Sequence, residues 1–300
     1  MGVQLSTCFI RVTFNQRNSC IPLHLKRRRC MRDKPCVLLE IKESIAFVTL
    51  NRPDKHNGLN RAAFEELVAA ASAIRKNKSI RAVVLSGAGP SFCSGLDFGY
   101  VTKHPSMIPR FFIKLPWRKD NMFQRAALVW QQLPVPVIAA IHGNCFGGAL
   151  QIALACDYRI ATPDAQFSIM EMKWGLIPDM SGTVHLSRLT RLDIAQELTM
   201  TGRVFSTKEA QDYGLVSRIC KNPHKQATEL ALRIAEQSPD AVAATKFLYR
   251  KTWKKSERIS LLWERLVQLR LLGRKNQMIA LRNGTKSEVD KKPFVNRTLF

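Results

Sequence analysis

Residues His142 to Gly182, HGNCFGGALQIALACDYRIATPDAQFSIMEMKWGLIPDMSG, are the most informative part of this chain about its fold. An apolar run rich in β-branched residues, Val135 to Ile141, precedes it and predicts one buried strand. A turn of small residues follows, and Ala149 to Cys156 then shows helical spacing. A strand that passes through a Gly-rich turn into a helix directs free backbone N–H groups at one point, where negative charge is stabilised.

Two acidic residues, Glu171 and Asp179, follow this helix in an otherwise apolar neighbourhood. Hydrogen-bond donors beside carboxylates in an apolar pocket suit proton transfer next to a carbonyl group. Simpler interpretations fit the same residues. Gly147 and Gly148 also suit close packing of a helix on a strand, and Asp179, which follows Pro178, also suits a turn. The combination of these signals, rather than any one of them, indicates a site.

The same stretch resembles the signature of the crotonase (enoyl-CoA hydratase/isomerase) superfamily, and the resemblance extends from about Pro35 to the last few residues. The matching blocks are NRPDKHNGLN (51–60), SFCSGLDF (91–98), HGNCFGGAL (142–150), ACDYRIAT (155–162), Glu171 to Gly182, and TGRVFSTKEAQDYGLV (201–216). The resemblance implies an α/β fold, a crotonase-like spiral of ββα units with a C-terminal helical trimerisation region.

This resemblance divides the chain into a basic N-terminal extension (1–34), a spiral core (35–225) and a helical oligomerisation region (226–300). Residues 1–35 carry eight Lys or Arg against one acid and include Ser and Thr. That composition is typical of a mitochondrial transit peptide, with a disordered arm as the alternative. The C-terminal leucines exceed what one helix buries on its own chain, and the family uses such helices for trimer contacts. We therefore expect a homotrimer or a dimer of trimers.

Composition sets the broad class. Three hundred residues, 46% of them apolar, suffice for a sizeable core. No run reaches the roughly 18 consecutive apolar residues that a membrane span needs. The eight cysteines show no CxxC motif or zinc-ligand spacing, which predicts reduced thiols in an intracellular protein. Cys145 and Cys156 lie in apolar segments and are expected in the core.

The net charge of +24 predicts attraction for polyanions such as the phosphates of coenzyme A, nucleic acid or an acidic lipid surface. Residues 240–300 alone carry fifteen Lys or Arg against five acids. RNA binding is one alternative function, because some relatives in the superfamily bind RNA. It is not favoured, because aromatic residues make up only 8% of the chain and do not alternate with basic ones. A non-catalytic protein that kept the fold is another alternative.

The resemblance also assigns roles to residues. The backbone N–H groups of Leu96 and Gly148 would form an oxyanion hole for the thioester oxygen. Lys55 would lie at the coenzyme A entrance, and Asp97 and Gln151 beside the substrate. Coenzyme A would enter only as part of the acyl-CoA substrate, so we expect no separate cofactor and no metal.

The reaction depends on which carboxylates are present. Hydratases of the family use two Glu, and their positions correspond here to Gln151 and Glu171. Glutamine does not exchange a proton at neutral pH, so a double-bond shift by Glu171 alone is favoured over hydration. Dienoyl-CoA isomerases add an Asp eight residues further on, which is Asp179 here, but they also carry an acid where this chain has Gln151. A double-bond shift in an enoyl- or dienoyl-CoA thioester is therefore the favoured activity, with hydratase as the alternative. Glu171 would be the base that moves the proton, and Asp179 a second acid or base or an electrostatic partner.

The spacing of apolar residues and the positions of Gly, Pro and capping residues also predict the main helices and strands. Residues 99–134 are expected to form an irregular lid with a helix near its end. The predicted strands are 37–42, 45–50, 82–86 and 215–220, and the predicted helices are 61–76, 121–132, 186–201, 207–213, 224–237, 239 onward and 256–273.

Overall fold

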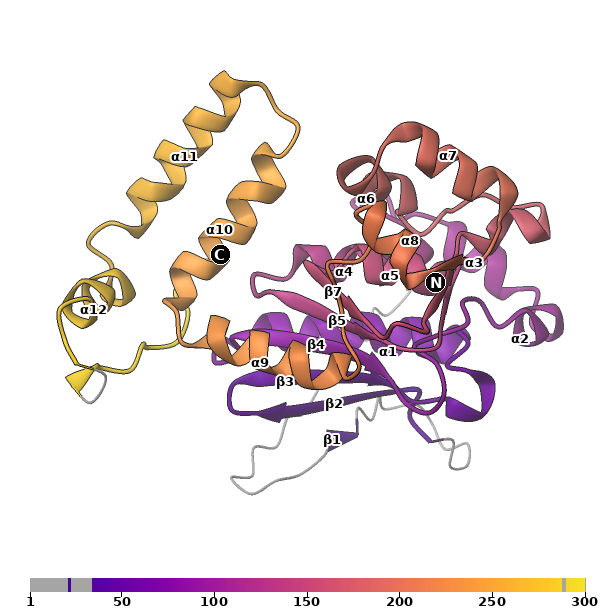
Figure 1. The fold of residues 1–300 in the computed structure, drawn as a ribbon, viewed down its shortest axis with the longest axis horizontal. Coiled ribbons are helices and arrows are strands. Elements are labelled where there is room, and N and C mark those ends of the chain that lie inside the picture. Colours follow the sequence, from indigo (N-terminus) through magenta and orange to yellow (C-terminus); the bar gives the residue numbers. More distant parts are fainter. Residues whose placement is uncertain (1–20, 23–33, 288–289, 300) are drawn as a thin grey trace, which may run out of the picture.

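The computed structural model describes residues 21–22, 34–287 and 290–299. Its main sheet has the strand order β1-β2-β3-β4-β5-β7-β10 (Figure 1). The strands are β1 (Ile21–Pro22), β2 (Val37–Lys42), β3 (Ile45–Leu50), β4 (Ala82–Gly87), β5 (Val137–Ile141), β7 (Tyr158–Ala161) and β10 (Arg218–Ile219). The transit peptide expected at residues 1–34 falls almost wholly outside the described residues and stays a prediction.

Strands β2 and β3, both predicted from the sequence, pair as an antiparallel hairpin, because Glu43 and Ser44 both adopt positive φ angles, 48° and 65°. Positive φ at both turn residues matches the right-handed twist of the flanking strands. From β3 onward the neighbouring strands of the sheet run parallel. Parallel neighbours require crossover connections, which places helices between successive strands.

A second sheet of three short strands was not predicted from the sequence. It has the order β6-β8-β9. Its strands are β6 (Asn144–Phe146), β8 (Gln166–Ser168) and β9 (Phe205–Ser206). Strands of two or three residues are too short for an alternating pattern to show. This sheet matters for the site, because β6 ends just before Gly147 and β8 just before the segment that carries Glu171.

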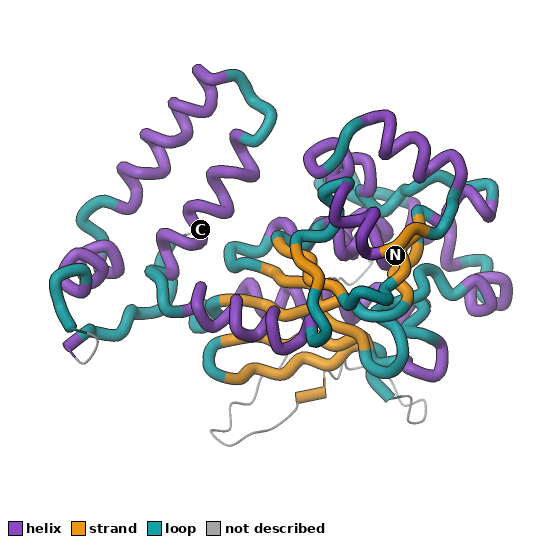
Figure 2. Tube along the Cα trace, viewed as in Figure 1, coloured by secondary structure: helices purple, strands orange, loops and turns teal. Residues whose placement is uncertain are grey.

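The helices surround the main sheet and extend beyond it (Figure 2). Two of the helical segments, η1 and η2, are single turns of 3-10 helix. The elements are η1 (Pro53–Lys55), α1 (Arg61–Lys76), α2 (Phe98–Lys103), α3 (Met107–Phe112), α4 (Met122–Gln132), α5 (Gly148–Leu154), η2 (Met170–Trp174), α6 (Gly182–Leu189), α7 (Leu192–Thr201), α8 (Thr207–Asp212), α9 (Pro223–Ala235), α10 (Pro239–Thr252), α11 (Glu257–Leu271) and α12 (Lys275–Asn283).

Several predicted helix ends are confirmed by their caps. Asn60 accepts a hydrogen bond from the Ala63 N–H at the start of α1. Ser206 and Glu209 form a reciprocal capping box at the start of α8, and Asn121 and Gln124 form another at the start of α4. Such side chains satisfy backbone donors that lack partners within the helix. The local sequence therefore sets these boundaries.

Other expectations were wrong in detail. The single helix predicted across residues 186–201 is two helices, α6 and α7, because Thr190 and Arg191 are extended. The lid at residues 99–134 is largely helical, with α2, α3 and α4 in succession. The strand predicted at residues 215–220 is reduced to the two residues of β10.

Strand β4 is buried on both faces, as its uninterrupted apolar run indicates. Val83 and Leu85 join the larger core together with α1, α4 and α5, whereas Val84 packs with Ala227 and Ala231 of α9 on the opposite face. Helix α9 therefore covers the core sheet, and the expected boundary between residues 225 and 226 falls inside it. The helices that leave the core begin with α10.

Helices α10, α11 and α12 project away from the sheet (Figure 1). Five leucines of α11 and its C-cap are largely uncovered in the single chain: Leu261, Leu262, Leu266, Leu269 and Leu272 are each at least 45% exposed. The expected trimer stays a prediction. No helix in the described part of the chain is long and apolar enough to cross a membrane.

Candidate active site

A cavity of about 650 Å³ opens beside the turn between β6 and α5. Of the seven site residues expected from the sequence, six line this one cavity. They are Lys55, Leu96, Asp97, Gly148, Glu171 and Asp179. The seventh, Gln151, does not line the cavity and contacts its wall through Glu171 and the backbone of Met180. Residues from four separate sequence blocks thus meet at one place.

The two expected oxyanion donors lie in this wall. Gly148 is the first residue of α5, and Leu96 forms an isolated parallel bridge with Leu59. Within the described residues, neither the Leu96 N–H nor the Gly148 N–H donates a hydrogen bond to a protein acceptor. Both donors therefore remain available to a bound oxygen atom.

Gly95 allows the two donor segments to approach. It has φ of 89°, and a Cβ at this position would lie 2.7 Å from the Phe146 carbonyl oxygen and 3.6 Å from the Gly148 nitrogen. Contact at 2.7 Å is not tolerated by a real Cβ, and the backbone conformation itself disfavours L side chains. The SFCSGLDF block therefore needs glycine before Leu96.

Two residues that were not among the expected site residues hold the chain on either side of Leu96 in place. The buried amide of Asn57 donates to the carbonyls of Ala88 and Ser91, both at 2.8 Å. Arg52 forms a 2.9 Å ion pair with Asp97, whose other oxygen caps α2 by accepting from the Tyr100 N–H. Both residues lie in the NRPDKHNGLN block, which was the only sequence signal for them.

Glu171 lies in the single turn η2 that follows β8. Its Oε1 accepts a 2.6 Å hydrogen bond from Gln151 Nε2. Its Oε2 is buried and has no hydrogen-bond partner in the described part of the protein. Gly147, with φ of 51°, passes close to this carboxyl group, and a Cβ there would lie 3.2 Å from Glu171 Oε1. One oxygen is thus anchored while the other stays free.

Burial changes the acidity of both carboxyl groups. It raises the pKa of Glu171 above its usual value, partly offset by its own backbone N–H and by Gln151, while the charge of Asp179 raises it further. Burial also raises the pKa of Asp179, with its own backbone N–H acting in the opposite direction. A carboxyl group with a raised pKa exchanges protons closer to neutral pH. The apolar cavity wall that was expected from the sequence therefore raises the pKa of both carboxyl groups.

Gln151 also holds the loop that carries Asp179. Its Oε1 accepts hydrogen bonds from the backbone N–H groups of Met180, at 2.8 Å, and Gly182, at 2.9 Å. The amide thus uses its donor on Glu171 and its acceptor on the loop. This arrangement makes Gln151 a positioning residue for both carboxylates, rather than the direct substrate contact expected for it.

The rest of the cavity wall is apolar and comes largely from residues 99–134, the segment that was expected to form an irregular lid. Phe98 of α2 stacks on Trp174 of η2 with ring centroids 4.0 Å apart. Further apolar residues of α2, α3 and α4 line the same wall: Val101, Ile108, Phe112 and Phe123. In the described residues, no group of three or more His, Cys, Asp and Glu side chains is arranged to hold a metal ion.

Comparison with known proteins places this geometry in context. The Enoyl-CoA hydratase/isomerase family model matches residues 40–287. The mitochondrial Delta(3,5)-Delta(2,4)-dienoyl-CoA isomerase of Rattus norvegicus is 38% identical over 216 residues, 68% of this chain and 65% of that protein. The (E)-benzylidenesuccinyl-CoA hydratase of Thauera aromatica is 36% identical over 213 residues, 70% of this chain and 80% of that protein.

A solved structure of enoyl-CoA hydratase from Bacillus anthracis has a TM-score of 0.78 at 29% identity, covering 86% of this chain and 98% of that one. The spiral core and its cavity therefore define a protein of the crotonase superfamily. More specifically, the chain belongs to the enoyl-CoA hydratase/isomerase family. The match spans 65% of the length of the rat isomerase.

Proposed function

We propose that this protein shifts a double bond in an enoyl-CoA or dienoyl-CoA thioester, with Glu171 as the base that moves the proton. The observation that carries the proposal is the unpartnered Oε2 of Glu171, which is buried in the wall that also presents the Leu96 and Gly148 amides. A base with one anchored and one free oxygen suits proton transfer in a fixed direction.

The proposed steps use only groups of the chain. Ionised Glu171 removes a proton from an acyl carbon, and the electron pair of that C–H bond moves through the conjugated system to the thioester oxygen. The two amides stabilise the resulting enolate or dienolate. Protonated Glu171 then returns the proton to a different carbon, which leaves the double bond shifted. Asp179, in the same wall, would act as a second acid or base when the two carbons are far apart.

Isomerisation is favoured over hydration because of Gln151. Addition of water needs one group to activate the water and another to deliver a proton. Gln151 cannot do either by ionising, and its amide is engaged with Glu171, Met180 and Gly182. The relatives include both a dienoyl-CoA isomerase and a hydratase, so hydratase remains the second candidate.

The substrate would lie with its coenzyme A portion toward Lys55, which is exposed at the cavity mouth. We propose coenzyme A only as part of that substrate. We also propose a homotrimer or dimer of trimers and a mitochondrial location. The basic residues 1–34 and the mitochondrial relatives from rat and human support that location, although the relative from Arabidopsis thaliana is peroxisomal.

One preparation assayed side by side with three substrates tests the reaction. We expect turnover of 3-enoyl-CoA or 3,5-dienoyl-CoA and little hydration of 2-enoyl-CoA. We expect Glu171→Gln to lose at least about 100-fold in kcat, since general acid–base catalysis contributes roughly that much or more. Strong hydration by the native chain would overturn the choice of reaction, and full isomerase activity in Glu171→Gln would overturn the role of Glu171. Binding of acyl-CoA without any turnover would favour a non-catalytic protein.

A further inference from the structure

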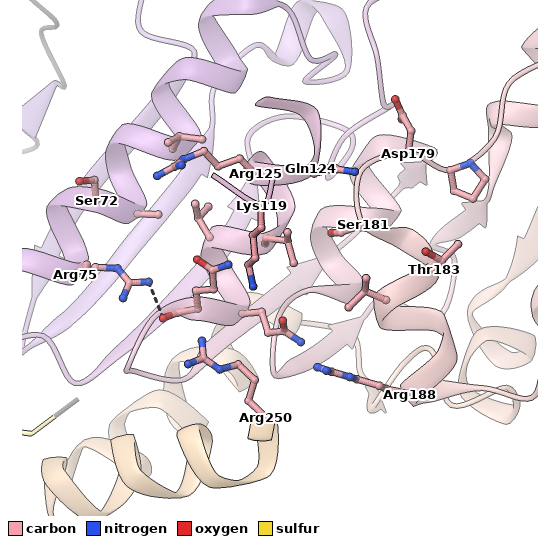
Figure 3. Close-up of a pocket in the computed structure, with 18 of the residues that line it drawn as sticks. Ser72, Arg75, Lys119, Gln124, Arg125, Asp179, Ser181, Thr183, Arg188 and Arg250 are labelled. Carbon is pink, nitrogen blue, oxygen red and sulfur yellow. Dashed lines mark hydrogen bonds between the residues drawn. The ribbon is translucent and has the colours of Figure 1, made fainter. Parts of the chain in front are cut away.

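A second, larger cavity lies behind the loop that carries Asp179. It measures about 1060 Å³ and is walled by α1, α4, α6 and α10 (Figure 3). Ile177 and Asp179 belong to the walls of both cavities, whereas Lys55, Leu96 and Glu171 belong only to the first. The second cavity is thus adjacent to the proposed active site and separate from the oxyanion donors.

Six basic side chains line this cavity, which we call the basic cavity. Arg75, Lys119, Arg188 and Arg250 reach toward it from different elements (Figure 3). Arg125 and Lys251 complete a set of six cations in the wall. Asp179 is the one acidic residue among the described residues that line it. The wall therefore carries a large local excess of positive charge.

Protein carboxylates do little to balance this excess. Of the six cations, Arg125 alone forms an ion pair with a carboxylate of the described chain, Asp120, at 3.8 Å. Arg75 donates instead to the neutral Gln132 carbonyl oxygen, at 2.6 Å. Asp120 lies outside the wall. Arg250 and Lys251 lie over the Phe247 ring, at 5.8 and 5.6 Å from its centroid, rather than beside a carboxylate.

The cations also act on one another. Burial lowers the pKa of the Arg250 guanidinium, and the nearby charges of Arg75 and Arg188 lower it further, while the charge of Asp157 acts in the opposite direction. Like charges held together in a partly buried space repel, and a bound anion would remove that repulsion. Arg250 lies on α10 whereas the other two lie on α1 and α6, so the repulsion acts between separate parts of the fold.

The chemistry of the wall favours phosphate groups. The planar guanidinium fork matches the oxygens of a phosphate and can bind two of them at once. Hydroxyl and amide groups lie among the cations and add uncharged hydrogen-bonding partners: Ser72, Gln124, Ser181 and Thr183. The cavity is recessed between helices, which suits a small ligand rather than a nucleic-acid duplex.

We propose that the basic cavity binds a small anion carrying several phosphate groups, in contact with Arg75, Arg188 and Arg250. The test uses the full chain and inorganic tripolyphosphate, titrated calorimetrically at about 50 mM ionic strength. We expect saturable binding at one site per chain. We expect the double variant Arg188→Gln with Arg250→Gln to weaken that binding by at least about tenfold, because charge-assisted bonds to phosphate are the strong ones.

The matched control removes two positive charges elsewhere. Lys221 and Lys225 are exposed near the start of α9 and line neither cavity. Lys221→Gln with Lys225→Gln should therefore keep the native affinity within about twofold. If circular dichroism shows that the double arginine variant does not fold, the same titration is made on Lys119→Gln. Lys119 is an exposed residue of the basic cavity, so its replacement should also weaken tripolyphosphate binding.

Two results would overturn the proposal. One is the lack of saturable tripolyphosphate binding by the native chain, which would also be the outcome if a neighbouring subunit filled the cavity. The other is equal weakening in the control and the cavity variants. That outcome would show diffuse attraction by the net charge, as expected for non-specific polyanion binding.

Discussion

Gln151 and Glu171 are joined by a 2.6 Å hydrogen bond from Gln151 Nε2 to Glu171 Oε1. The same Gln151 side chain accepts hydrogen bonds from the backbone N–H groups of Met180 and Gly182, which follow Asp179 in the chain. One uncharged amide therefore orients the proposed base and anchors the second carboxylate. Its position corresponds to the place where relatives with hydratase chemistry are expected to carry an acid.

Gln151→Glu should change the reaction. A carboxylate at this position keeps the two acceptor contacts to the loop but places negative charge beside Glu171, which raises the pKa of Glu171 further. We expect 2-enoyl-CoA hydration to rise at least about tenfold, and the acid limb of the isomerisation pH profile to move to higher pH. Product analysis by chromatography at several pH values measures both. Gln151→Met is the control, because it removes the contacts without adding charge, and unchanged hydration in Gln151→Glu would contradict the expectation.

Glu171→Gln should stabilise the protein at neutral pH while it removes activity. Burial raises the folded-state pKa of Glu171 above its usual value of 4.5, so folding favours the protonated form. The ionised group therefore costs stability above the folded-state pKa, and that cost disappears as pH falls toward 4.5 and below. We expect the variant to have a higher Tm than the native chain at pH 7 to 8 and an equal Tm near pH 4. Calorimetric scans across this range test it, and a lower Tm at pH 8 would contradict the prediction.

Gly95→Ala should damage the oxyanion hole. The new Cβ would meet the Phe146 carbonyl oxygen at 2.7 Å and push the Leu96 segment away from Gly148. Loss of one oxyanion donor costs on the order of 100- to 1000-fold in kcat. Gly273→Ala is the matched control, because Gly273 also has positive φ, 73°, but nothing lies within 4 Å of its Cβ position. Steady-state kinetics on both variants compare them, and equal losses would mean that backbone strain alone was responsible.

Lys246→Met should destabilise the junction between α10 and the core. Lys246 Nζ pairs with Asp157 Oδ2 at 2.6 Å and donates to the Val135 carbonyl oxygen at 2.9 Å, while Asp157 accepts from the Val137 N–H at 2.7 Å. Removing Lys246 leaves the carboxylate of Asp157, which is 27% exposed, without its cation, so we expect a loss below the about 3–5 kcal/mol that a fully buried pair costs. Urea unfolding measures the loss. Adding Asp157→Asn should recover part of it, and strictly additive losses would show that the two residues do not interact.

The exposed leucines of α11 should be required for assembly. Leu262, Leu266 and Leu269 are 45%, 45% and 67% exposed in the single chain. Replacing Leu266 and Leu269 by Lys would place charges on a surface that we expect to be buried between subunits. Sedimentation velocity should show the native chain as a trimer or hexamer and the variant as a smaller species. Arg258→Gln with Arg265→Gln is the control on the same helix, and a monomeric native chain would remove the expectation.

Much of the fold could be predicted from local sequence signals. Strands β2 and β3 end where the alternation of apolar residues ends, and α1 begins at its Asn60 cap. These features depend on interactions within a few residues, so they can be recognised in one dimension. The three-stranded sheet and the break at Thr190 could not be recognised this way. Their strands and turns are too short for a periodic signal, and they exist because distant segments pair with them.

The candidate active site and the basic cavity likewise combine features that the sequence predicts with features that depend on folding. The order of residues supplies the chemical groups: a carboxyl at Glu171, another at Asp179, an amide at Gln151, and glycines that permit tight turns at the donor segments. Folding brings Gln151 against Glu171 and the Asp179 loop instead of the cavity, and brings six cations from four helices and a loop into one recess. The physical reason is that hydrogen bonds and charge repulsion depend on distances of a few ångströms, which residues far apart in the chain acquire only when the sheet and its helices pack.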